Sequence, residues 1–186
     1  MSSHHIVREN QEPALIVEDF FALDNEYLGQ ILEWSPSIIT DIYNLDYFIS
    51  DGIKVDLIYS KKIDVPQEEI KFIEPKTDFV SDTLSYLIQQ QYKSVNILSK
   101  CINPILLDYA DKIDIVSFVA SKRYMFVRKK FNKWKVKGER IDIDVSRVKS
   151  FINLKYLSNN NFEVENDGFI TIEFDSDHYM YIAEEL

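Results

Sequence analysis

Three aspartates occupy positions where this sequence could carry out chemistry. Asp41 follows the apolar run at residues 37–40, while Asp78 and Asp82 follow Pro75 and have Ser81 between them. Carboxylates in such positions can hold a divalent cation or transfer a proton. The same residue type also caps helices, because its side chain accepts hydrogen bonds from the free amide N–H groups of the first turn. Both interpretations are open for Asp41 and Asp82.

Residues 69–98 form the unit that would position Asp78 and Asp82. A strand at residues 69–74 ends at Pro75, which cannot donate to a sheet. Leu84, Leu87 and Ile88 then have helical spacing, and residues 95–98 form another strand. This order of strand, helix and strand is the crossover unit of a parallel sheet. Its acidic loop lies at the carboxyl end of a strand, where open α/β sheets bind ligands.

The rest of the N-terminal half repeats this alternation. Asp24 is the expected N-cap of a helix at residues 23–34, and Gly52 should follow a helix at 41–51 as its C′ residue. A polar loop is expected at 61–68 and a short helix at 104–109. Further strands are expected at residues 14–18, 37–40, 55–59 and 113–118. The prediction is an α/β parallel-sheet domain over residues 1–118, with Asp41, Asp78 and Asp82 converging at its carboxyl edge.

The pattern changes to strict alternation in the second half. Ile141 and Ile143 alternate with aspartates, and similar alternation recurs up to the last strand with turn residues between the segments. We therefore expect a small all-β sandwich over residues 119–186, without helices. Trp134 falls in an alternating strand and is expected in the core, although it could instead stack on a ligand ring.

Composition and charge exclude several classes of function. The formal charge of −10 repels phosphate backbones, which argues against nucleic acid as a partner. The four glycines are isolated, so neither common glycine-rich phosphate loop is present. The single Cys101 fits a cytoplasmic protein, and no apolar run is long enough for a membrane span. The N-terminus lacks the apolar segment of a signal peptide.

The segment at residues 122–140 is strongly basic, with nine Lys or Arg residues against Glu139 alone. It could bind an anion or an acidic partner, including the acidic half of a second subunit. Alternatively, its lysines could be a solvated outer face that protects a sheet edge from pairing.

Several segments, in order, resemble the thiamin pyrophosphokinase family. They are Thr40-Asp41 before a helix, the Asp-Gly turn that opens residues 51–58, Pro75 with Asp78 and Ser81-Asp82, and Ser158-Asn159 before two strands. The resemblance implies transfer of diphosphate from ATP to the hydroxyl of thiamine with Mg²⁺, in a homodimer. It also implies catalytic roles for Asp41 and Asp82, and ligand binding by Asp78, Ser81, Ser158 and Asn159. The alternative for Ser158 and Asn159 is a hairpin turn.

The departures from that family concern its metal and phosphate residues. Where the family has Gly-Asp-x-Asp, this chain has Ser60-Lys61-Lys62-Ile63, and Leu84 replaces a glutamate. Residues 99–104 lack the family's Gly-Gly-Arg-x-Asp-His pattern. We therefore expect weak or no catalysis and assign no metal ligand, so that Mg²⁺ and ATP are cofactors only if the family activity is retained. One alternative is a working enzyme with its metal on Asp41, Asp64, Asp78 and Asp82. Another is a dimer without catalysis that binds a thiamine-like molecule or a protein partner.

Overall fold

Strands and helices alternate through the N-terminal half, as the sequence predicts. The computed structural model describes residues 12–186. Its first ten elements are β1 (Ala14–Val17), α1 (Asn25–Leu32), β2 (Ile38–Asp41), α2 (Ile42–Ser50), β3 (Leu57–Tyr59), β4 (Lys71–Ile73), α3 (Phe79–Gln89), β5 (Ser94–Leu98), the 3-10 helix η1 (Pro104–Asp108) and β6 (Asp114–Val119). The six strands are parallel and lie in the order β4-β3-β2-β1-β5-β6.

Local capping chemistry explains where the helices begin and end. The side chains of Asp24, Asp41 and Asp78 each accept a hydrogen bond from the first turn of α1, α2 and α3, which confirms Asp24 as an N-cap and the capping interpretation of Asp41. Gly52 follows α2 with a φ of +67°, the left-handed conformation that glycine adopts at little cost. The predicted helices are each longer than the observed ones by a few residues.

The C-terminal half consists of strands and one short helix. Its elements are β7 (Lys122–Val127), β8 (Lys130–Lys135), β9 (Arg140–Ile143), the 3-10 helix η2 (Val145–Arg147), β10 (Val148–Ile152), β11 (Leu154–Ser158), β12 (Asn161–Val164), β13 (Gly168–Phe174) and β14 (Met180–Glu185). The α/β half followed by an all-β sandwich confirms the predicted fold class. The expectation of no helix in this half is wrong, because Asp144 caps η2 through a bond from the amide of Ser146.

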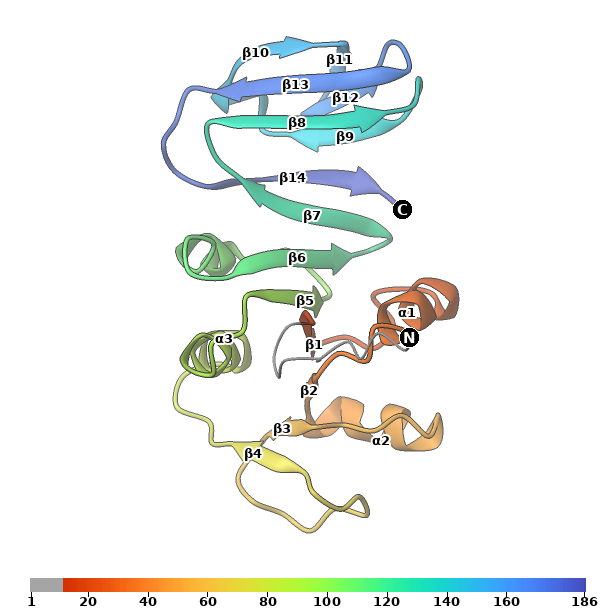
Figure 1. The fold of residues 1–186 in the computed structure, drawn as a ribbon, viewed down its shortest axis with the longest axis vertical. Coiled ribbons are helices and arrows are strands. Elements are labelled where there is room, and N and C mark those ends of the chain that lie inside the picture. The colour runs from red at the N-terminus through yellow and green to blue at the C-terminus, as the bar shows by residue number, and fades with distance from the viewer. Residues whose placement is uncertain (1–11) are drawn as a thin grey trace, which may run out of the picture.

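The two halves share one long sheet, which the sequence did not predict. β7 pairs antiparallel with β6, and the sheet then continues through β14, β9, β12 and β11 (Figure 1). β10, β13 and β8 form a second sheet. The antiparallel strands of the long sheet and this second sheet enclose an apolar core that includes Phe162, Ile172 and Ile182.

Helices and the second sheet cover the faces of the long sheet unequally. α3 packs on one face, and α1 and α2 pack on the other. On that second face, Phe118 of β6 pairs with Arg123 of β7, which pairs with Glu184 of β14. Glu184 in turn contacts Lys133 of β8. The second sheet therefore lies on the same face as α1, farther along the long sheet.

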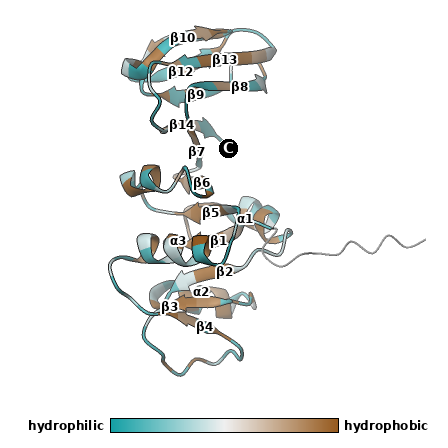
Figure 2. Ribbon diagram, turned by 60° about the vertical axis from the view of Figure 1, so that its left-hand side comes forward, coloured by the Kyte–Doolittle hydropathy of each residue, from teal (hydrophilic) through white to brown (hydrophobic). Residues whose placement is uncertain are grey.

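Hydropathy follows this layering. Strands β3 and β5 are brown in Figure 2, whereas the long loop that precedes β4 is mostly teal. Trp134 is an exception to the predicted core, because 52% of it is exposed on the outer side of β8, where it pairs with the exposed Phe169. In the described part of the chain, no helix has the length and apolar character needed to cross a bilayer.

Candidate functional site

The carboxyl edge of the parallel sheet contains a topological switch point. From β1 the chain proceeds outward through β2, β3 and β4, and then returns through α3 to β5 on the other side of β1. Open α/β sheets bind ligands in the crevice outside the carboxyl ends of the two strands at such a point. The first residues after β1 and β5 are Glu18 and Ser99.

Glu18 and Ser99 are bonded to each other across the switch point. The hydroxyl of the buried Ser99 donates a short hydrogen bond to Oε2 of Glu18. Burial raises the pKa of Glu18; the bond from Ser99 opposes this, and the charges of Asp78 and Asp41 raise the pKa further. The two aspartates therefore lie near enough to Glu18 for their charges to act on it.

Asp41 combines helix capping with one free carboxylate oxygen. Its Oδ1 accepts from the amides of Tyr43 and Asn44, each at 3.0 Å, and from the Asn44 carboxamide at 2.9 Å. The same carboxamide nitrogen donates to the carbonyl of Glu18 at 3.2 Å, which ties the end of β1 to the start of α2. Oδ2 of Asp41 has no hydrogen-bond partner among the described residues.

Asp78 is similar, with one oxygen engaged. Its Oδ1 accepts from the amide of Ser81 at 3.0 Å, and its Oδ2 has no partner in the described part of the chain. Ser81 stands in the first turn of α3, where its carbonyl accepts a long bond from the hydroxyl of Tyr109. Asp41 and Asp78 thus each keep one oxygen that can accept a ligand donor.

Asp82, by contrast, is saturated by donors from its own chain. Its Oδ2 accepts from the amides of Lys76 and Thr77 at 2.6 and 2.9 Å and from the hydroxyl of Tyr59 at 3.0 Å, and its Oδ1 accepts from the Thr77 hydroxyl at 2.8 Å. Burial alone would raise the pKa of Asp82, but these bonds lower it to about 2. Asp82 therefore organises the loop between β4 and α3, and its assignment as a catalytic residue remains a prediction.

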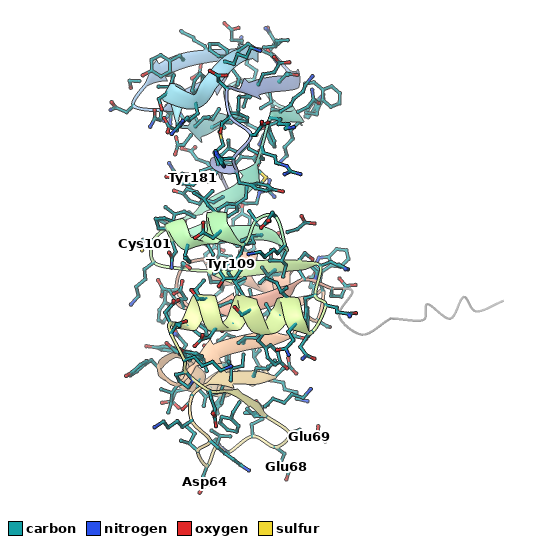
Figure 3. The ribbon with its side chains drawn as sticks, turned by 90° about the vertical axis from the view of Figure 1, so that its left-hand side faces the viewer. Asp64, Glu68, Glu69, Cys101, Tyr109 and Tyr181 are labelled. Carbon is teal, nitrogen blue, oxygen red and sulfur yellow. The ribbon has the colours of Figure 1, made fainter. Side chains whose placement is uncertain are left out.

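The residues at this edge form no ready-made cluster of metal ligands. Magnesium is usually held by one or two carboxylates together with waters and substrate phosphates, and the described residues contain no group of three or more acidic, histidine or cysteine side chains that could hold a metal ion. Asp82 has no unengaged oxygen. Asp64 lies at the far end of the molecule near Glu68 and Glu69, so the site of four aspartates is not formed (Figure 3).

A small cavity of about 270 Å³ lies beside this edge, beyond Ser99. Its lining includes Glu18, Lys100, Cys101 and Asn103. Cys101 is a free, exposed thiol. Lys61 and Lys62, which replace the acidic positions of the resembled motif, are exposed in the loop after β3. The edge therefore presents the carboxylates of Glu18, Asp41 and Asp78 beside a polar cavity, an arrangement that attracts cations and hydrogen-bond donors.

Ser158 and Asn159 lie far from this edge within one chain. They form the hairpin between β11 and β12, and the positive φ values of Asn159 and Asn160, 47° and 67°, are those of a type I′ turn. The turn interpretation of these residues accounts for their geometry. In the order β11-β12-β9-β14-β7-β6-β5-β1-β2, eight strand spacings separate β11 from β2. At about 4.8 Å per spacing this distance is roughly 38 Å.

The basic segment is largely used inside the C-terminal half. Arg123, Lys133 and Lys135 all contact the buried carboxylate of Glu184. Lys122 pairs with Asp142, Lys129 with Asp177, and Arg128 lies over the ring of Tyr179. Several of the cations thus neutralise acids of their own half, and lysine-rich β8 is also an edge strand of the second sheet, so both an anion-binding surface and edge protection stay as predictions for this segment.

Together, these features define an α/β protein with a switch-point site, extended by a β-sandwich on the same sheet. The sequence matches no protein-family model and no curated protein. Solved structures do match: a protein from Lactobacillus plantarum has a TM-score of 0.70 at 11% identity, covering 95% of this chain and 98% of that one. Yeast thiamin pyrophosphokinase has a TM-score of 0.66 at 10% identity over 98% and 88% of the two chains. The Bacillus subtilis thiamine pyrophosphokinase has a TM-score of 0.61 at 11% identity over 92% and 97%. The chain has the thiamin pyrophosphokinase fold.

Sequence reasoning missed Glu18, Ser99 and Asn44. Glu18 and Ser99 each directly follow a buried strand, the same signal that identified Asp41. Applying that criterion to the predicted strand at 95–98 would have found Ser99, whereas Glu18 falls inside the predicted strand at 14–18 and would still have been missed. Asn44 gives no such signal, because its role depends on the spatial approach of α2 to the end of β1.

Proposed function

We propose that this protein binds a small cationic, thiamine-like molecule at the acidic edge, as a homodimer in the cytoplasm, with little or no diphosphate transfer. The observation that carries the proposal is the contrast between the carboxylates. Glu18, Asp41 and Asp78 have free oxygens, and the pKa of Glu18 is raised mainly by burial and further by the repulsion of Asp78 and Asp41. A cationic ligand would relieve that repulsion. Both oxygens of Asp82, by contrast, already accept hydrogen bonds from the chain.

Phosphate groups are disfavoured at the same edge. The helix N-termini where a phosphate would bind are those of α2 and α3, and their amides already donate to Asp41 and Asp78. A bound phosphate would compete with these caps and lie beside fixed negative charge. We therefore expect thiamine to bind more tightly than thiamine diphosphate.

A ligand that binds the native state raises its thermal stability. Thiamine should raise the melting temperature of the wild type, and the double variant Asp41→Asn with Asp78→Asn should lose the shift. Asparagine caps helices as well as aspartate does, so the double variant keeps its fold while losing both charges. Asp46→Asn, an exposed change of the same kind on α2, is the matched control and should keep the shift. Equal shifts in all three proteins would contradict the proposal.

The catalytic part of the proposal has its own test. Wild-type protein, thiamine, ATP and Mg²⁺ should yield little or no thiamine diphosphate, as measured by chromatography over hours. Robust turnover would refute the proposal of lost catalysis. If Asp82→Ala then removed that turnover, the alternative of a working pyrophosphokinase would replace it.

The dimer follows from the separation of the proposed ligand residues. Ser158 and Asn159 can share a ligand with the acidic edge only if they come from a second chain, because roughly 38 Å separates β11, which ends at Ser158, from β2, which ends at Asp41, in one chain. A chain with Ser158→Ala and Asn159→Gly should not bind thiamine, and neither should Asp41→Asn with Asp78→Asn. Mixing the two chains under exchange conditions should restore binding at one site per mixed dimer. A monomer in sedimentation experiments would rule out this arrangement.

A further inference from the structure

A groove on the α1 face of the long sheet is independent of the acidic edge. It has a volume of about 520 Å³, within the range of small-molecule pockets. Asn96 of β5, Phe118 of β6 and Arg123 of β7 line it from the long sheet, and Tyr27, Gln30 and Trp34 line it from α1 and the residues after it. The groove lies where α1 and the second sheet leave the long sheet uncovered between them. None of Glu18, Asp41 and Asp78 lines it.

Asn96 is an unusual residue for its position. It pairs with Leu15 of β1 and Val116 of β6, so the carboxamide stands between apolar neighbours on one face of a central strand. Asparagine is depleted in strands. Its side chain makes no hydrogen bond with a described residue, although Asn96 is half-buried. The polar atoms of this carboxamide are not among the buried ones, so both its donor and its acceptor are accessible from the groove.

Aromatic rings surround this amide. Trp34 is 68% exposed and has no ring contact with a described residue, while Phe118 presents a nearly buried ring. The hydroxyl of Tyr27 and the carboxamide of Gln30 are also without hydrogen-bond partners in the described part of the chain. Flat apolar surfaces combined with a few unpaired donors and acceptors are typical of a site for a planar polar molecule.

Arg123 already has a carboxylate partner inside the protein. Its Nη2 lies 2.5 Å from Oε2 of Glu184, which also contacts Lys133 and Lys135. We propose that the groove binds an uncharged, planar heteroaromatic molecule whose edge carries adjacent N–H and C=O groups. That edge pairs with the donor and acceptor of the Asn96 carboxamide, and the ring lies against Trp34 and Phe118.

The test uses quinazolin-4-one, which has such an edge, and naphthalene, which has the ring shape without it. In a full-length Trp134→Phe background, Trp34 is the one remaining tryptophan, and its fluorescence reports on the groove. Quinazolin-4-one should quench it saturably. Asn96→Leu should weaken that binding by about tenfold, the value of a hydrogen-bonded pair. The same change should leave naphthalene binding equal or tighter, which also shows that the groove is intact. Asn25→Ala, an exposed change on α1, is the control and should alter neither.

Three results would overturn the proposal. The first is quenching by quinazolin-4-one that does not saturate up to its solubility limit. The second is equal affinity in the wild type and Asn96→Leu, which would mean that the edge is not recognised. The third is a red shift of Trp34 emission when residues 2–11 are deleted, with probe binding only in the deleted form. That result would assign the groove to the chain's own N-terminal segment.

Discussion

Glu184 is the buried charge on which the junction between the two halves depends. It lies on β14 with 1% of its side chain exposed. Its Oε2 accepts from Arg123 at 2.5 Å and from Lys133 at 2.7 Å, and its Oε1 accepts from Lys133 at 3.0 Å and lies 3.3 Å from the ammonium of Lys135. Burial opposes the ionised form, but the hydrogen bonds from Arg123 and Lys133 and the nearby charges leave the pKa of Glu184 below its ordinary value.

The perturbation is Glu184→Gln, which keeps the shape and removes the charge. Breaking a buried ion pair by removing one partner typically costs 3–5 kcal/mol, because the remaining charge is left buried and uncompensated. Here Lys135 is nearly buried but keeps Glu139, while Arg123 and Lys133 are partly exposed and can rehydrate. We therefore expect the lower end of this range, so that Glu184→Gln lowers the free energy of unfolding by about 3 kcal/mol. For a chain of this size the melting temperature falls by about 6–12 °C.

Urea denaturation followed by circular dichroism measures the change, with Glu185→Gln as the matched control. Glu185 is the next residue on β14 and is exposed, so its variant should stay within about 0.5 kcal/mol of the wild type. Adding Lys135→Met to Glu184→Gln should recover part of the loss, because it removes one of the stranded charges. A loss below about 1 kcal/mol in Glu184→Gln, indistinguishable from the control, would refute the reasoning.

Three further predictions concern single residues. Asp82→Ala should cost about 2 kcal/mol of unfolding free energy in the same assay, because it leaves four donors without their acceptor. Since the folded pKa of Asp82 is about 2, its contribution to stability is present above about pH 4 and is lost toward pH 2. Glu18 has a raised folded pKa, so wild-type stability should fall as the pH rises from its ordinary pKa through the folded one. Glu18→Gln should lack that fall in pH-dependent melting curves. Asn159→Ala should cost about 1 kcal/mol, because alanine resists the positive φ, whereas Asn159→Gly should not.

Much of the fold was predictable because its signals are local. Each helix starts at an aspartate whose side chain accepts from the amides that follow it. Gly52 follows the end of α2, where the positive φ favours glycine. The continuous sheet was not predictable, since the pairing of β6 with β7 depends on a turn at Ala120 and Ser121, both with positive φ. A positive φ cannot be predicted from alanine or serine in a sequence.

The site was predictable only in part, for the same reason. Asp41 and Asp78 follow predicted strands, and topology alone places them at one edge. The saturation of Asp82 depends on the fold of a loop that brings Tyr59 of β3 to α3, a contact across 23 residues. Trp134 was misplaced because alternation identifies two faces of a strand without saying which is inside. On β8 the inner face carries Phe131, Lys133 and Lys135, and the buried Glu184 supplies the reason.

The three N-caps together determine what this edge can hold. Asp24, Asp41 and Asp78 each fill the N-terminus of a helix with a carboxylate, at donor distances of 2.9, 3.0 and 3.0 Å. A helix N-terminus attracts a phosphate only while its amides are free and its partial positive charge is unbalanced. Where the amides already donate to carboxylates, a phosphate can bind only if a cation lies between the phosphate and those carboxylates. Asp82, to which the resemblance gives a catalytic role, has both oxygens bonded to Lys76, Thr77 and Tyr59. This arrangement supports the proposed function, in which the edge binds a cationic molecule and transfers little or no diphosphate.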